Sequence, residues 1–91
     1  MEETIEFPKE SLPQPKLEGR HPGIVALYKF FEFGHLPPHL AIIALSSASL
    51  AASMIDLLPD GPELTVGLRK LLEAKDCFVR AEVAVHWKVE K

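Results

Sequence analysis

The residues of this sequence that are able to do chemistry do not form a catalytic set. His35 and His39 are four residues apart, as in helical metal sites, but no third ligand accompanies them and no Cys-x-x-Cys spacing occurs. Glu73 and Asp76 alternate with arginines, which favours ion pairs over acid–base catalysis. The sequence also has no glycine-rich phosphate loop, and nothing in it marks one serine as an activated nucleophile. We therefore expect no enzyme activity, no catalytic residue, no metal and no cofactor.

Aromatic residues gather before a proline pair that is suited to the start of a helix. They are Tyr28, Phe30, Phe31 and Phe33, followed by His35 and then by Pro37 and Pro38. The free N–H groups of a helix start attract anions, and an aromatic ring beside them can stack on a base. This arrangement is compatible with nucleotide binding. The alternative is that the aromatics fill a hydrophobic core and that His35 caps the helix or senses pH.

Lys75 lies in an apolar part of the sequence. On a helix its neighbours three and four residues away are Leu71, Leu72, Phe78 and Val79. A lysine in this position extends its ammonium group to water, pairs with a carboxylate of another subunit, or faces an anionic ligand. Nearby, Arg69, Glu73, Asp76 and Arg80 alternate in charge at helical spacing, which is typical of a solvated face with weak ion pairs.

Two long helices must position these residues. Pro59 ends the first and Pro62 suits the first turn of the second, which predicts helices over about 37–58 and 62–88. Between them, Asp60 is expected to cap the second helix with Glu63 as its capping-box partner. The sequence thus predicts an all-α fold, an antiparallel helical hairpin preceded by a short aromatic segment that is helical or extended.

The first long helix has two apolar faces. The larger residues predict a core stripe, and the smaller ones predict a face that another helix can approach closely. The stripe is Leu36, Leu40, Ile43, Leu50, Met54 and Leu57; the small face is Ala41, Ala44, Ala48, Ala51 and Ala52. No lysine or arginine occurs between Lys29 and Arg69. The uncharged run 40–55 is shorter than the ~20 residues of a membrane span and contains four serines, so we expect burial by sister subunits rather than membrane insertion.

Composition defines one small domain with an arm. Residues 1–22 contain four prolines and five glutamates without apolar periodicity, which predicts a flexible acidic arm that adds little stability. Residues 23–91 are expected to form the hairpin domain, whose core is small enough to favour oligomerisation, since the single cysteine, Cys77, excludes an internal disulfide. The net charge of −3 gives no general attraction to polymeric nucleic acid or to a membrane. With no secretion signal at the start, we expect a cytoplasmic protein.

Two motifs give the chain a resemblance to a known family. The motif F-x-F-x-H-x-P at 31–37 and the segment LPDGPELTVGLRKLLEAKD at 58–76 resemble a group of short bacteriophage proteins that includes the anti-CBASS cyclic-nucleotide sponges. The similarity covers about residues 31–81. It implies a homo-oligomer of helical hairpins, typically a hexamer, that acts in the host bacterial cytoplasm. Such proteins sequester cyclic dinucleotides or trinucleotides without cleaving them, which is a form of immune evasion.

The resemblance also implies a ligand site. Phe33 matches the aromatic that stacks on a base, and His35 lies in the same motif. The family has a basic residue in the first helix that holds phosphate, whereas this chain has Ser46 and Ser47 in that region. Either these serines and helix N-termini replace it, helped by Arg69, Lys70 or Lys75 of a neighbouring chain, or this protein binds a different ligand. The rival hypothesis is a helical adaptor that binds a host or virion protein.

Overall fold

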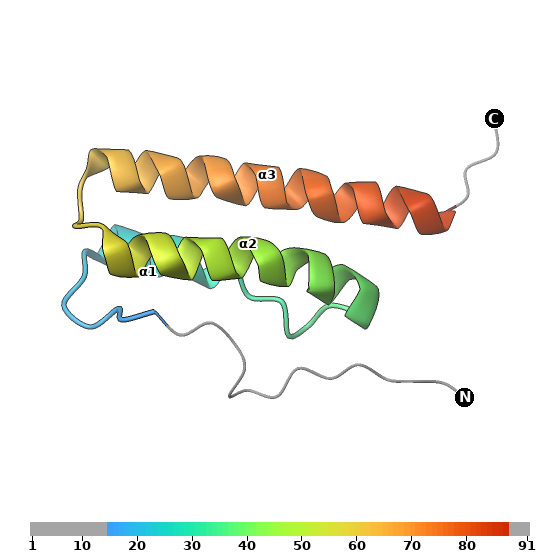
Figure 1. Cartoon of the computed structure of the whole chain (residues 1–91), viewed down its shortest axis with the longest axis horizontal. Helices are drawn as coiled ribbons and strands as arrows, with labels where there is room; N and C mark the ends of the chain where they lie inside the picture. Colours follow the sequence, from blue (N-terminus) through green and yellow to red (C-terminus); the bar gives the residue numbers. More distant parts are fainter. Residues whose placement is uncertain (1–14, 88–91) are drawn as a thin grey trace.

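The computed structural model describes residues 15–87 and shows three helices over that range (Figure 1). Helix α1 spans Pro22–Lys29, α2 spans Pro38–Leu57 and α3 spans Pro62–Trp87. The prediction of an all-α protein is confirmed for this part of the chain. The long helices α2 and α3 lie alongside each other, and α1 packs against both. The ends of α2 differ by one residue from those predicted, and residue 88, the predicted end of α3, lies outside the described residues.

Helix α1 resolves the first part of the segment that the sequence left as helical or extended, and of the four clustered aromatics it contains only Tyr28. It starts at Pro22, and the preceding His21 caps it, because Nδ1 of His21 accepts a hydrogen bond of 2.9 Å from the N–H of Gly23. It ends at Lys29, where the N–H of Phe30 is bonded to the last turn. The chain then continues without helix to Pro37, so Phe30 and Phe33 belong to the connection between α1 and α2.

The buried face of α2 is the alanine face. The prediction that the leucine stripe forms the core is therefore wrong for Leu50 and Leu57, while Leu36 and Met54 of that stripe pack against the core. The buried residues of α2 are Ala41, Ala44, Ser47, Ala48, Ala51, Ala52 and Ile55. By contrast, Leu50 and Leu57 are exposed, and Ile43 and Met54 are only half-buried. Small side chains let α1 and α3 approach the α2 backbone closely. Among the larger apolar residues of α2, Ile55 is buried, whereas Ile42, Leu50 and Leu57 remain at the surface.

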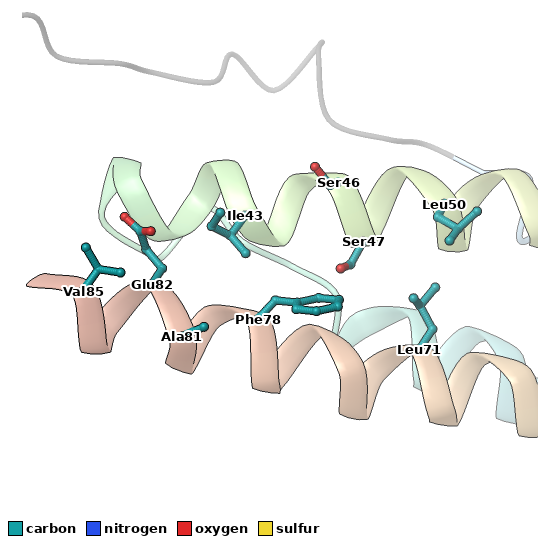
Figure 2. Close-up of a pocket in the computed structure, with 9 residues that line it drawn as sticks. All are labelled: Ile43, Ser46, Ser47, Leu50, Leu71, Phe78, Ala81, Glu82 and Val85. Atoms are coloured by element: carbon teal, nitrogen blue, oxygen red, sulfur yellow. The ribbon is translucent and has the colours of Figure 1, made fainter.

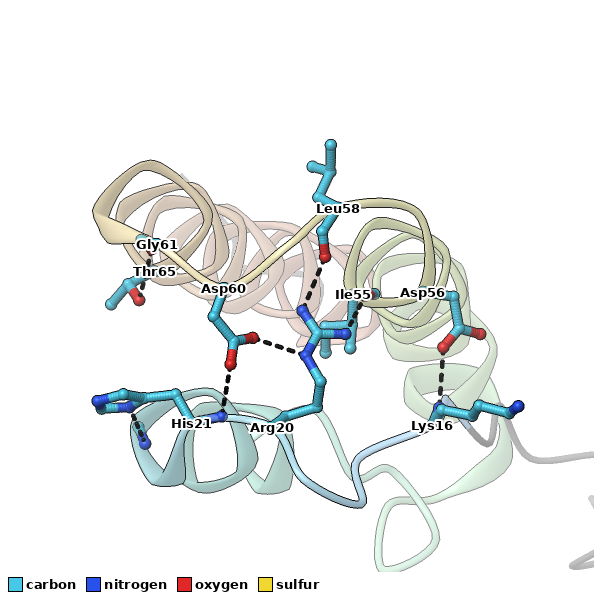
Figure 3. Close-up of polar contacts among 10 residues, drawn as sticks. Lys16, Arg20, His21, Ile55, Asp56, Leu58, Asp60, Gly61 and Thr65 are labelled. Carbon is cyan, nitrogen blue, oxygen red and sulfur yellow. Dashed lines mark hydrogen bonds and ion pairs between the residues drawn. The ribbon is translucent and has the colours of Figure 1, made fainter.

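Residues 16–21 are hydrogen-bonded to the turn between α2 and α3, and we refer to them as the strap (Figure 3). The N–H of Lys16 donates to Asp56 at 2.8 Å. Arg20 donates through Nε to Asp60 Oδ1 at 2.6 Å, through Nη2 to the carbonyl of Leu58 at 2.8 Å, and through Nη1 to the carbonyl of Ile55. Arg20 thereby satisfies carbonyl groups at the carboxyl end of α2 that have no partner within the helix.

Asp60 has a different role from the predicted helix cap. Its second oxygen accepts a bond of 2.7 Å from the N–H of His21, so both oxygens hold the strap. These hydrogen bonds, first that of Arg20 and then that of His21, lower the pKa of Asp60 below its ordinary value of 3.8. Residues 1–14 of the predicted flexible arm lie outside the described residues. The strap, by contrast, is hydrogen-bonded to the helix pair, and the composition of the arm did not predict these bonds.

The core is centred where the three helices meet. Phe31 and Phe33, from the connection before α2, are buried there, and the rings of Phe31 and Tyr28 stack with centroids 6.0 Å apart. From the helices, the other large buried side chains are Ile24, Ile55, Leu64 and Leu68. This confirms the alternative in which aromatics fill a core, for Phe31 and Phe33. Towards the carboxyl end of α3 the apolar side chains of Phe78 and Val85 are exposed instead.

Among the described helices, α2 has the length and apolar composition of a membrane span. Core helices of soluble proteins meet the same criterion. Only 39% of the apolar window of α2 is buried within the chain, so much of this largely apolar helix faces outwards.

Candidate functional site

The structure separates the predicted site residues into four places. His35 and Lys75 line one cleft, and Ser46 and Ser47 line a different groove. Phe33 is buried in the core. The remaining two, Arg69 and Lys70, are exposed on the first half of α3 and line neither the cleft nor the groove.

We call the first of these hollows the basic cleft. It has a volume of about 400 Å³ and lies between the connection that follows α1 and the middle of α3. The cleft is lined by Lys29, Phe30, Glu32, His35, Leu36, Lys75, Asp76, Val79 and Arg80. Two residues that the sequence predicted separately, His35 and Lys75, are 40 positions apart along the chain and meet at this one hollow.

The charges of the basic cleft are mixed, with an excess of positive charge. Three permanent cations and two carboxylates line it, so its formal charge is 3 − 2 = +1 with His35 neutral. Nζ of Lys75 lies 3.2 Å from Oδ1 of Asp76. The Lys75 side chain is largely buried rather than extended into water, and the carboxylate beside it belongs to its own chain. Arg80 donates a hydrogen bond of 3.3 Å to Sγ of Cys77, so the predicted row of ion pairs along α3 is replaced by these local contacts.

The aromatic residue at the mouth of the basic cleft is Phe30 rather than Phe33. Phe33 is 3% exposed, so a ligand cannot stack on its ring in this conformation. Phe30 is 64% exposed and lines the cleft directly. Both phenylalanines belong to the aromatic cluster in the sequence, but no sequence pattern indicated which of the two side chains would be exposed to water. Lys29, Phe30 and Arg80 are the cationic and aromatic residues of the cleft that the predicted site missed.

His35 does not cap α2, since no side chain caps this helix. The helix begins after Pro37, whose carbonyl accepts the first intrahelical bonds, from Leu40 at 3.0 Å and Ala41 at 2.8 Å. His35 is exposed and contributes to the wall of the cleft instead. The described residues contain no group of three histidine, cysteine, aspartate or glutamate side chains placed to hold a metal ion.

The second hollow is an apolar groove of about 530 Å³ between α2 and α3 (Figure 2). It is lined by Ile43, Ser46, Ser47, Leu50, Leu71, Phe78, Ala81, Glu82 and Val85. Ser47 points towards α3, whereas the hydroxyl of Ser46 points away from it (Figure 2). The two serines therefore do not converge on one phosphate position, and the groove has the composition of a surface that another protein segment covers.

No protein-family model, no curated protein and no solved structure matches this chain. The chemistry of the site therefore has to be judged from its residues. A cleft with ammonium, guanidinium and imidazole donors beside an exposed aromatic ring is equipped to bind an anion that carries a flat ring. It holds no nucleophile paired with a base among its lining residues.

Proposed function

We propose that this protein is a sponge that binds cyclic oligonucleotide second messengers in the basic cleft and keeps them intact. The observation that supports this most directly is the meeting of Lys29, His35, Lys75 and Arg80 beside the exposed ring of Phe30. Cations pair with the phosphates and the ring stacks on a base. The resemblance of residues 31–81 to phage anti-CBASS proteins supplies the ligand class, namely cyclic dinucleotides or trinucleotides, and the setting, the host bacterial cytoplasm.

A site that only sequesters its ligand needs fewer functional groups than a catalytic site does. A sponge needs a concave site that buries its ligand and a copy number sufficient to bind the messenger stoichiometrically. A formal charge of +1 in one cleft is small for a ligand with two or three phosphates. A second subunit that brings its own cations to the rim would raise it, so the proposal includes a homo-oligomer of helical hairpins, a hexamer by the resemblance.

The apolar groove is the surface that we assign to this self-association. It contains Phe78, which is 56% exposed, and Leu50 and Val85, which are also exposed. The α2 wall of the groove carries no charged residue, so a second copy meets no unpaired charge there. In a two-fold contact the same groove of each copy faces the other, and Leu50 of α2, which is exposed in one chain, becomes buried between two.

Light scattering after size-exclusion chromatography is expected to give a mass several times that of the 10.1 kDa chain. Phe78→Glu should shift that mass towards the monomer, because it places a charge in the apolar groove. Val66→Glu is the matched control, since Val66 is an exposed apolar residue of α3 that does not line the groove. A monomeric wild-type protein at micromolar concentration would contradict the assignment.

Isothermal titration calorimetry tests the ligand site. With a cyclic dinucleotide or trinucleotide that binds the wild type, Lys75→Ala should weaken binding by about tenfold or more, because a charge-assisted hydrogen bond contributes roughly 1.5–3 kcal/mol. Lys70→Ala removes the same charge from the same helix outside the cleft and should leave the affinity nearly unchanged. Equal losses in both variants would show that only overall charge matters.

A helical adaptor is the second candidate function, and the exposed groove is the observation that favours it. In that case a helix of a host or virion protein occupies the groove in place of a second copy. The two candidates differ in what stabilises the protein. A sponge has a higher melting temperature with a cyclic oligonucleotide, whereas an adaptor does not respond to one.

A further inference from the structure

Phe30 lies at the boundary between two hollows. The basic cleft is on one side, and a second hollow of about 660 Å³, which we call the outer hollow, is on the other. Both are lined by Lys29 and Phe30, so these two residues form the ridge that they share. The remaining lining of the outer hollow is Arg20, Pro22, Val25 and Ala26, which come from the strap and from α1.

The two hollows differ in chemistry. The basic cleft holds most of the cations, while the outer hollow is walled mainly by proline, valine, alanine and the ring of Phe30. The guanidinium of Arg20 is already bonded to Asp60 and to two carbonyls at the carboxyl end of α2. The outer hollow therefore offers flat apolar contact, with the ammonium of Lys29 at its edge.

We propose that Phe30 is the stacking platform of the site and that the ligand straddles it. One base lies in the basic cleft, a second base lies in the outer hollow, and the phosphates between them face Lys29. This inference rests on the proposed function and makes it more specific, because only a ligand with two bases joined by anionic linkages fills both hollows. A cyclic dinucleotide has this form, and a mononucleotide fills one hollow only.

The exposure of Phe30 makes its role testable without damage to the fold. Its side chain projects into water beyond the end of α1, so its removal opens no cavity in the core. Phe30→Ala should weaken binding of the cyclic dinucleotide by about ten- to a hundredfold, the loss expected for one or two stacked bases. Phe30→Leu keeps an apolar side chain without a ring and should lose nearly as much, whereas Phe30→Trp should retain binding.

Ala26 provides a test of the outer hollow alone. It is exposed on α1 and lines this hollow but not the basic cleft. Ala26→Leu partly fills the hollow and should weaken binding of the cyclic dinucleotide while leaving the weaker binding of a mononucleotide unchanged. Leucine favours a helix nearly as much as alanine does, so α1 should persist. Circular dichroism of each variant checks that the fold is kept.

The experiment is calorimetry of the full chain and of these variants with cyclic di-AMP, cyclic di-GMP and AMP as probes. We expect the wild type to bind a cyclic dinucleotide more tightly than AMP. Phe30→Ala should lose this tighter binding, and Phe30→Trp should retain it. If the wild type binds a cyclic dinucleotide and Phe30→Ala binds it equally well, the platform is wrong and the proposed function stands. Equal affinity of Ala26→Leu and the wild type would overturn the straddling geometry. If neither cyclic dinucleotide binds the wild type, the inference fails, whereas the proposed function fails only if cyclic trinucleotides do not bind either.

Discussion

Replacing Phe33 with alanine is expected to destabilise the fold rather than to disable a ligand site. The ring is 3% exposed and belongs to the cluster that contains Phe31, Ile24 and Leu68. Loss of a buried phenylalanine costs about 3–5 kcal/mol, because apolar contacts are lost and a cavity remains. Small domains are stable by only about 5–15 kcal/mol, so the variant should be close to unfolding.

Thermal unfolding followed by circular dichroism measures this effect, and Phe30→Ala is its matched control. The two phenylalanines are three residues apart, but Phe30 is mostly exposed and its removal should change the melting temperature little. A Phe33→Ala protein that melts like the wild type would show that the ring is not part of the core. The same result would restore Phe33 as a candidate for base stacking.

The second large effect is expected from Arg20→Ala. Arg20 joins the strap to the end of α2 through the carbonyls of Ile55 and Leu58 and to the turn through Asp60. Hydrogen bonds that involve a charged group contribute roughly 1.5–3 kcal/mol, and here one side chain makes several. We expect a loss of about 2–3 kcal/mol, which for a domain of this size lowers the melting temperature by roughly 10–20 °C.

Lys16→Ala is the control for Arg20→Ala. It removes a cation from the same strap, but Lys16 bonds to Asp56 through its backbone N–H, which the substitution keeps. Its melting temperature should therefore stay near that of the wild type. Similar losses in both variants would mean that charge in the strap, rather than the bonds of Arg20, provides the stability.

The strap also predicts a dependence of stability on pH. Because folding lowers the pKa of Asp60, its contribution is fully present above the ordinary value of 3.8 and is lost as the pH falls through the lower pKa of the folded state. The side chain of Arg20 is the main cause of that shift, so Arg20→Ala should lose stability less steeply with acid than the wild type. An unchanged acid profile would contradict the ion pair.

Local sequence signals were sufficient to predict the two long helices, but not α1. Pro37 and Pro38 mark the start of α2, and Pro59 and Pro62 mark the turn, because proline disrupts a helix interior and suits its first turn. The faces of α2 were harder to interpret. Alanines and leucines both repeat at helical spacing, and which face packs within the chain depends on how closely α1 and α3 approach, which periodicity does not encode.

The candidate site could be predicted only in part. His35 and Lys75 were identified from their unusual neighbours, and the structure brings them to one cleft. Phe30 was not distinguished from Phe33, because the chain between α1 and α2 has no periodicity from which to infer burial. The bonds of Arg20 to Asp60 join residues 40 positions apart, so no local pattern could reveal that Asp60 serves the strap rather than the start of α3.

Retention of an intact messenger tests the central claim most directly. The purified protein is incubated with a panel of cyclic dinucleotides and trinucleotides, separated from free ligand, and denatured, and the released ligand is measured by mass spectrometry. The sponge proposal predicts that at least one cyclic oligonucleotide is retained in a fixed ratio to the protein and is recovered unchanged. Absence of any retained ligand, or recovery of a linear cleavage product, would contradict it.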